Sequence, residues 1–501
     1  MKSAPTIVSL LAWLFIRLPL MFSLPFAAMS LGWVFWGFRY LNDRVASPIA
    51  RRVADFAVAQ IPLIGSSLAS NLDAFFHALV VMGLFFLGFL AAYNLAALLN
   101  GIVFRFGMKS IHYATGAPQV PGPAGMPASD PFANVERIGI VLAGGGAKGA
   151  YQAGAMKAIY RFLAEHNALG KVKVLSSTSI GSWNALFWLA DLIMPERNWQ
   201  NRSVHEQWWR AINVKSLAAP SWYVPGLRNA FLTSAPWQRV FDHIIDRDGV
   251  RDRLLQSSIH FYMTRSDVRS AELTCATNDP SPPPIPRVAY DTLDPSEPRK
   301  FIAGVKAAVF ASMDLPPLFP YATQGNSLYE DGGVIDNLPI QFPATKNCDL
   351  IFILPLNSDF EQTPNQSSII VRLLRVMDVR QGALERGGFK MLYLYNELAA
   401  LRDALRAASA QPTSTADSTP LADALLRRHR LISVFAVCPL KTFVRETIDT
   451  IELWKTREAG IAFEVMHKAT ADLLPTFKFK PQDRTRVALV SRSGITWDER
   501  F

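Results

Sequence analysis

Residues 137–154 read RIGIVLAGGGAKGAYQAG, which is an apolar run of strand length, a glycine-rich loop and the start of a helical pattern. The helical pattern continues to Gly170. Such a loop exposes backbone N–H groups beside the positive end of a helix dipole, and these donors can hold a phosphate or a developing oxyanion. The stretch therefore predicts an anion-binding loop, although a loop needed only for tight packing remains an alternative.

A nucleotide is the first anion to consider, because Gly144, Gly146 and Gly149 satisfy the G-x-G-x-x-G pattern. A dinucleotide site also requires an acidic residue at the end of the next strand, where it holds the ribose. The next apolar segment, KVKVLSS at 171–177, ends in serines. A Walker loop requires Ser or Thr after its lysine, whereas Lys148 is followed by Gly149. The pattern disfavours both nucleotide sites.

The segment VLSSTSIGSW at 174–183 indicates a nucleophile elbow, in which a serine lies on a sharp turn between a strand and a helix. Ser179 is the candidate nucleophile, and the expected helix runs from Ile180 toward Pro195. Gly181 supplies one of the two small flanking residues, but Ser177 stands where the G-x-S-x-G pattern has its first glycine. A serine that only caps the helix is the alternative.

A serine nucleophile needs a base, and the eight histidines are scattered along the chain with none in a glycine-rich turn. The segment SLYEDGGVIDNLPI at 327–340 offers a carboxylate instead. Asp331 follows a strand-like run, and Gly332 and Gly333 let the backbone turn sharply after it. Asp331 is therefore the candidate base, with a simple turn as the alternative.

Four segments occur in an order that resembles the patatin-like phospholipase family. They are GGGAKGAYQAG, STSIGS, ASMDLPPLFP at 311–320 and DGGVIDNLP. The resemblance covers roughly residues 136–350. Four spaced motifs in the right order are much more specific than any one of them.

The resemblance implies an α/β, three-layer fold with a central, mostly parallel sheet, and hydrolysis of lipid acyl esters by a Ser-Asp dyad without a catalytic histidine. It makes Ser179 the nucleophile and Asp331 its base. Lys148 would support the loop, meet a lipid phosphate or lie in solvent. No metal and no cofactor are expected. The resemblance assigns the oxyanion hole to Gly144, Gly145 and Gly146. The geometry expected of the elbow and of the turn gives supporting roles to Ser177, Gly181, Gly332 and Gly333.

Half of the residues are hydrophobic and only 18% are charged, which points to membrane segments. Residues 78–104 contain no charge and exceed the roughly 20 apolar residues that cross a bilayer as a helix. A second span is predicted at about 18–38, where a cleaved signal peptide is the alternative. The net charge of +10 comes without a basic block interleaved with aromatics, so we expect a lipid bilayer and no nucleic acid as partner.

The predicted organisation is a membrane anchor at 1–109, a Pro/Gly/Ala-rich linker at 110–135 and a catalytic domain at 136–350. A mostly helical C-terminal extension with an exposed loop at 409–420 follows at 351–501. Charges on either side of the two spans do not decide the topology. Unpaired cysteines favour a cytoplasmic catalytic domain.

The sequence thus favours a membrane-anchored serine lipid acyl hydrolase of phospholipase A or lysophospholipase type, with membrane lipids as its substrate. Two other classes remain open. The first is a membrane scaffold that keeps the fold and is catalytically silent, which Ser177 makes plausible. The second is a dinucleotide-binding protein.

Overall fold

The computed structural model describes one compact unit within residues 100–501. Apart from Ala78, both predicted spans fall outside the described residues, and they stay predictions. In the part of the chain that is described, no helix is both long and apolar enough to cross a bilayer. The described residues are 130–194, 202–212, 217–220, 230, 232–247, 249–316, 318–357, 369–409, 430–450, 452, 455–479 and 486–498, with Pro48, Arg52 and Ala78.

A mixed sheet runs through this unit, in the order β13-β12-β11-β10-β1-β2-β5-β6-β7. Every pair from β12 to β5 is parallel, whereas β12–β13 and β5–β6 are antiparallel. A short β9 pairs with β5 and with β8. The bounds are β1 Ile138–Leu142, β2 Val172–Thr178, β5 His260–Asp267, β6 Glu272–Thr277, β7 Val288–Thr292, β8 Ala322–Gln324, β9 Ser327–Asp331, β10 Leu350–Leu354, β11 Ser433–Pro439, β12 Val487–Ser491 and β13 Gly494–Asp498.

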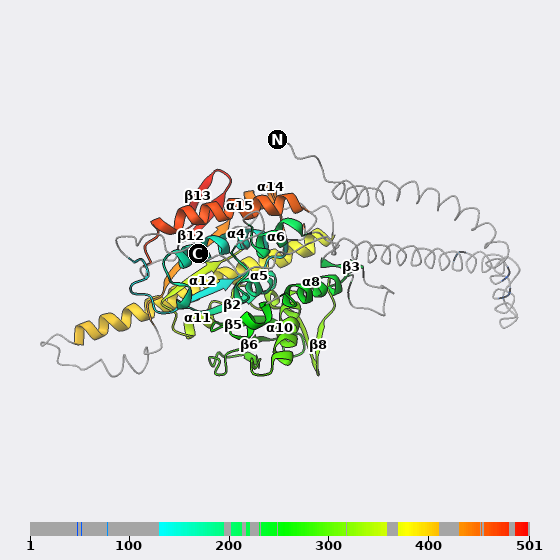
Figure 1. The fold of residues 1–501 in the computed structure, drawn as a ribbon, viewed down its shortest axis with the longest axis horizontal. Helices are drawn as coiled ribbons and strands as arrows, with labels where there is room; N and C mark the ends of the chain where they lie inside the picture. Colours follow the sequence, from blue (N-terminus) through cyan, green and yellow to red (C-terminus); the bar gives the residue numbers. More distant parts are fainter. Residues whose placement is uncertain are drawn as a thin grey trace, which may run out of the picture. The chain divides into compact units, whose positions relative to one another are not determined.

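Helices cover both faces of the sheet, which gives three layers (Figure 1). The strand period of two sends Ile140 and Leu142 into one hydrophobic core and Val141 and Ala143 into another. The first core includes α4, α5, α10 and α15, and the second includes α11 and α12. The α/β expectation with a mostly parallel sheet is therefore confirmed. The helix bounds are α4 Gly149–Glu165, α5 Ile180–Leu189, α6 Val204–Ala211, α8 Ala235–Ile245, α9 Val250–Leu255, α10 Pro298–Met313, α11 Gln341–Thr345, α12 Ile369–Ser409, α14 Lys441–Glu446 and α15 Thr456–Leu473.

The C-terminal residues belong to the same sheet as the glycine loop. β11 pairs with β10, and β12 and β13 extend the sheet further. The sheet thus continues across residue 350, where the sequence analysis places a domain boundary. Helix α15 lies beside α4, and their backbones approach so closely that a Cβ on Gly154 would lie 2.1 Å from the carbonyl oxygen of Phe463.

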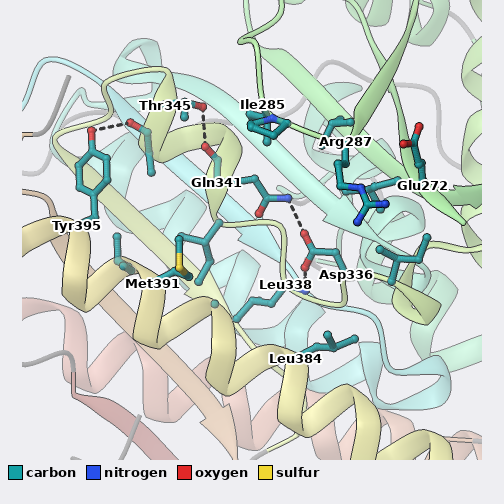
Figure 2. Close-up of a pocket in the computed structure, with 18 of the residues that line it drawn as sticks. Glu272, Ile285, Arg287, Asp336, Leu338, Gln341, Thr345, Leu384, Met391 and Tyr395 are labelled. Atoms are coloured by element: carbon teal, nitrogen blue, oxygen red, sulfur yellow. Dashed lines mark hydrogen bonds between the residues drawn. The ribbon is translucent and has the colours of Figure 1, made fainter. Parts of the chain in front are cut away.

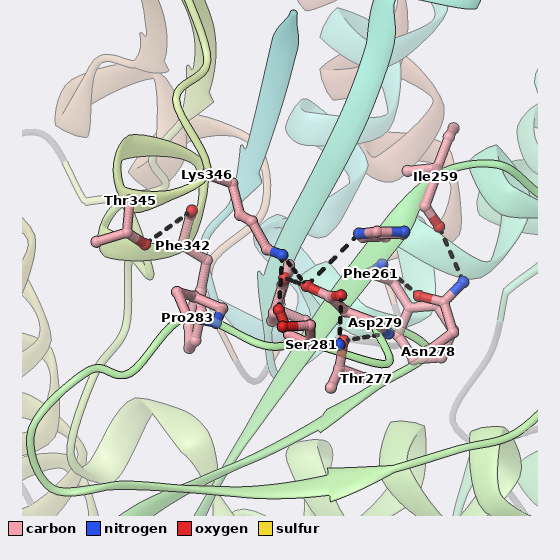
Figure 3. A network of polar contacts seen from close by, with 12 residues as sticks. Ile259, Phe261, Thr277, Asn278, Asp279, Ser281, Pro283, Phe342, Thr345 and Lys346 are labelled. Atoms are coloured by element: carbon pink, nitrogen blue, oxygen red, sulfur yellow. Dashed lines mark hydrogen bonds and ion pairs between the residues drawn. The ribbon is translucent and has the colours of Figure 1, made fainter. Parts of the chain in front are cut away.

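A buried carboxylate ties the end of β6 to the end of α11 (Figure 3). Asp279 forms an ion pair with Lys346 and accepts hydrogen bonds from the hydroxyl of Tyr262 and, at 3.0 Å, from the backbone N–H of Ser281. Lys346 also donates to the carbonyl of Ser281 at 2.8 Å. Because α11 follows the turn after β9, these bonds help to fix the segment that carries Asp331.

The close approach of α4 and α15 predicts the effect of a single methyl group. Gly154→Ala must push the two helices apart and should lower the free energy of unfolding by about 1–3 kcal/mol, as overpacking does. Gly170→Ala is the matched control, because a Cβ there meets no atom within 4 Å. Thermal denaturation of the two variants measures the difference, and equal melting temperatures would contradict the observed helix packing.

Candidate active site

Ser179 lies on a sharp turn between β2 and α5. Its backbone has φ 53° and ψ −127°, in a region that residues other than glycine rarely adopt. Its backbone N–H donates to Oγ of Ser312 at 2.8 Å. Although Ser179 occupies the N-cap position of α5, its side chain makes no capping hydrogen bond. The Ser179 hydroxyl therefore does not cap the helix, contrary to the capping alternative.

The hydroxyl of Ser179 instead donates to Oδ2 of Asp331 at 2.5 Å. Asp331 ends β9, and its Oδ1 accepts the backbone N–H of Gly333 at 2.7 Å. Burial raises the pKa of Asp331 to about 7, against the lowering effect of these two hydrogen bonds. The carboxylate is thus a stronger base than an exposed aspartate, and it already contacts the proton it would take.

One strand sets the spacing of the serine and the aspartate. β5 pairs with β2 along its first part, where Thr178 lies opposite Thr264. The next residue, Arg265, lies opposite Asp331 on β9. Thr178, which precedes the nucleophile, and Asp331 therefore pair with two consecutive residues of β5, although they are far apart in the sequence.

Small residues allow the close approaches around the elbow. A Cβ on Gly181 would lie 2.4 Å from the carbonyl oxygen of Leu142, so α5 begins almost in contact with β1. A Cβ on Gly332 would lie 2.6 Å from the carbonyl oxygen of Thr264. Gly181 and Gly332, two of the three glycines predicted to have supporting roles, are therefore required sterically.

Ser177, the departure from the elbow pattern, belongs to a chain of hydroxyls beneath the nucleophile. Its buried Oγ lies 3.1 Å from Oγ of Ser182, which lies 3.0 Å from Oγ of Ser312. Ser312 accepts the N–H of Ser179. Serine at position 177 is thus accommodated with its hydroxyl group satisfied.

Ser312 and Asp314 contribute to the site, and the sequence analysis gave neither a role. The backbone carbonyl of Asp314 accepts the N–H of Asp331 at 3.1 Å. Burial, together with the neighbouring Asp331, raises the pKa of the Asp314 carboxyl to about 8. Both residues lie in the ASMDLPPLFP segment, which is the signal that could have pointed to them. The segment contributed to the family resemblance as a motif, without a role for any single residue.

The three glycines of the predicted oxyanion hole are not equivalent. The N–H of Gly144 already donates to the carbonyl of Asn337 at 3.3 Å. Among the described residues, neither Gly145 nor Gly146 uses its N–H in a hydrogen bond. The loop lies against the nucleophile, because a Cβ on Gly144 would lie 2.9 Å from Cβ of Ser179. Gly145 and Gly146 thus have the donors that remain for an oxyanion.

The same loop is poorly suited to a dinucleotide. The carbonyl oxygen of Thr450 accepts the N–H of Ala147 at 2.8 Å and would lie 2.2 Å from a Cβ on Gly146. A phosphate would place its own acceptor oxygens against this carbonyl. The contact disfavours the dinucleotide alternative, independently of the missing ribose acid.

Lys148 lies in the interior. Its side chain is buried, and Nζ donates to Oδ1 of Asn357 at 2.5 Å. Burial raises the pKa of Glu385 to about 7, and the charge of Lys148 opposes this rise. Burial also acts to raise the pKa of Asp449, but the charge of Lys148 helps to hold it below its usual value. Of the three roles considered, these contacts favour support of the loop.

Asn184 connects the elbow helix to the helix of the glycine loop. Its Nδ2 donates to the carbonyl of Gly149 at 3.1 Å, and its Oδ1 accepts Nε1 of Trp209 at 2.9 Å. The same Oδ1 lies 2.8 Å from Nε2 of His205, whose pKa is lowered to about 3 by burial and by Lys157. His205 is therefore neutral and has a structural role. Within the described residues, no histidine forms a hydrogen bond with the candidate nucleophile or base.

An apolar pocket of about 510 Å³ is lined by the segment that follows β9 and by α12 (Figure 2). Ile335 and Leu338 line it from this segment, and Leu384 and Met391 line it from α12. Asp336, also in its wall, accepts Nε2 of Gln341 at 2.6 Å. α12 thus lies beside the segment that follows the candidate base, and Leu338 shares a hydrophobic core with Phe389 of that helix.

Comparison with known proteins supports one family. Residues 140–343 match the family model described as patatin-like phospholipase. No curated protein matches the chain. Among solved structures, VipD from Legionella pneumophila is 14% identical over 73% of this chain and 71% of that chain, with a TM-score of 0.28. Residues 140–343 therefore form a patatin-like phospholipase domain by this match, in agreement with the resemblance that the four sequence motifs carry.

Proposed function

We propose that the chain is a serine lipid acyl hydrolase of phospholipase A or lysophospholipase type, with Ser179 as nucleophile and Asp331 as base. The observation that carries the proposal is the 2.5 Å contact between Oγ of Ser179 and Oδ2 of Asp331. The left-handed backbone of Ser179 supports it, since such conformations cluster at functional sites. The family match supports an acyl ester of a membrane lipid as the substrate class.

The proposed reaction begins when Oγ of Ser179 attacks the acyl carbon and its proton passes to Asp331. The N–H groups of Gly145 and Gly146 stabilise the resulting oxyanion. Each such donor is worth about 3–4 kcal/mol in a well-studied serine hydrolase. The tetrahedral intermediate then breaks the ester C–O bond, and the leaving alkoxide takes the proton from Asp331.

Deacylation repeats the sequence with water. Asp331 takes a proton from the water that attacks the acyl-enzyme, and this proton returns to Oγ of Ser179 as the fatty acid leaves. The raised pKa of Asp331 suits both steps, because a base whose pKa is near the working pH can accept and return a proton. The catalytically silent scaffold remains the alternative to be tested.

Removal of either group of the dyad should abolish hydrolysis without unfolding the protein. Ser179→Ala and Asp331→Asn should each lower kcat by roughly 10³-fold or more, and their effects should not add because the dyad acts as a unit. The measurements are hydrolysis of a short-chain ester and labelling by a fluorophosphonate, with Ser270→Ala, an exposed serine, as control. A wild-type protein that neither reacts with the label nor cleaves any acyl ester would favour the silent scaffold.

The pKa of Asp331 predicts the pH dependence of the reaction. The base acts when it is deprotonated, so kcat/KM should rise with pH through about 7. An ordinary aspartate would give a rise near pH 4. The profile should be measured with an uncharged ester, so that the substrate itself does not titrate. A kcat/KM that is already constant between pH 5 and 8 would show that burial does not raise this pKa.

We further propose that residues 18–38 and 78–104 anchor the chain in a membrane, with the catalytic domain in the cytoplasm. The uncharged run at 78–104 and the unpaired cysteines support this arrangement. The full chain should stay in the membrane pellet after carbonate washing, and external protease should spare the catalytic domain in intact cells. Release into the wash would refute the anchor, and cleavage in intact cells would reverse the topology.

A further inference from the structure

We propose that Glu385 of α12, outside the matched domain, is a positioning residue that holds the glycine loop in the shape required to bind the oxyanion. The inference rests on the proposed hydrolase function. It assigns part of the active-site geometry to a residue that follows the end of the family match by some forty residues.

Glu385 is a fully buried carboxylate that accepts three hydrogen bonds. Its Oε1 accepts Nδ2 of Asn337 at 2.5 Å and Nδ2 of Asn357 at 2.6 Å. Its Oε2 accepts the backbone N–H of Asn357 at 3.3 Å. Glu385 therefore joins the segment after β9 to the segment after β10.

Asn337 transmits this position to the glycine loop. Its Nδ2 also donates to the carbonyl of Gly144 at 3.2 Å, and its own backbone carbonyl accepts the N–H of Gly144 at 3.3 Å. Its Oδ1 would lie 2.5 Å from a Cβ on Gly144. The N–H and the carbonyl of Gly144 are thus both bound by one residue, whose side-chain amide is oriented by Glu385.

Asn357 makes a second connection from Glu385 to the loop. Its Nδ2 donates to Glu385, while its Oδ1 accepts Nζ of the buried Lys148 at 2.5 Å. The charge of Lys148 favours the ionised form of Glu385, against burial, which raises the pKa of that carboxyl to about 7. Removing the charge of Glu385 is costly, because the buried charge of Lys148 is then left uncompensated.

The loop's other neighbour also comes from the C-terminal region. The carbonyl of Thr450 binds the N–H of Ala147 and lies against Gly146, which has a positive φ of 57°. The N–H groups of Gly145 and Gly146 therefore lie between two anchored points, Gly144 and Ala147. A change at Glu385 releases the first of these points.

The experiment uses the full-length protein, after the wild type and Ser179→Ala have established whether the chain is a serine hydrolase. Glu385→Gln removes the charge and replaces one acceptor by a donor. We expect kcat to fall roughly tenfold to a hundredfold, with KM changed by less than about twofold. Inhibition by a trifluoromethyl ketone, which places an anionic oxygen in the same hole, should weaken by a similar factor.

Two further variants separate positioning from folding. Glu397→Gln makes the same chemical change on an exposed side chain of the same helix and should leave kcat and inhibition unchanged. Glu385→Asp keeps the charge that balances Lys148 but shortens the side chain by one methylene. It should fold even if Glu385→Gln does not, and should still lose kcat.

The outcomes distinguish the two proposals. Parallel losses of kcat and of trifluoromethyl ketone binding in the Glu385 variants support the positioning role. If these variants melt earlier but keep wild-type kcat and inhibition per labelled active site, Glu385 only stabilises the fold and the inference is overturned. A wild type that does not react at all refutes the proposed function instead.

Discussion

The register of β5 is the constraint on which the site depends. Thr264 fixes the end of β2, one residue before the nucleophile, and Arg265 fixes Asp331 at the end of β9. The side-chain period of a strand is two, so a slip of one residue would turn Asp331 away from Ser179. Backbone pairing thus sets a contact between residues 152 positions apart, before any side chain of the site is considered.

The sharp turn at Ser179 and the turn after Asp331 were predictable because their signals are local. Gly181 and Gly332 mark places where another backbone lies too close for a side chain, and such requirements are visible in a short stretch of sequence. The order of the strands in the sheet was harder to predict from the sequence. The apolar runs that form β11 and β12 lie in a region whose pattern is mostly helical, and short apolar runs do not reveal which strand they will join.

The polar interior of the site could not be predicted in the same way. Glu385 lies in a charged helical stretch, LERGG at 384–388, where a glutamate is expected to face solvent. Its burial depends on the amides of Asn337 and Asn357, which reach it from two different strand ends. Contacts of this kind are set by tertiary packing, and no periodicity in the sequence indicates them.

The continuation of the sheet into the C-terminal region bears on how the protein is made. β1, which begins the catalytic domain, pairs with β10, and β10 pairs with β11 at 433–439. A nascent chain that has emerged only to the end of the matched family segment still lacks β10, α12 and the carbonyl of Thr450. Domains fold as units during synthesis, so the glycine loop acquires its final shape late. The proposed hydrolase would then become competent only when its chain is nearly complete.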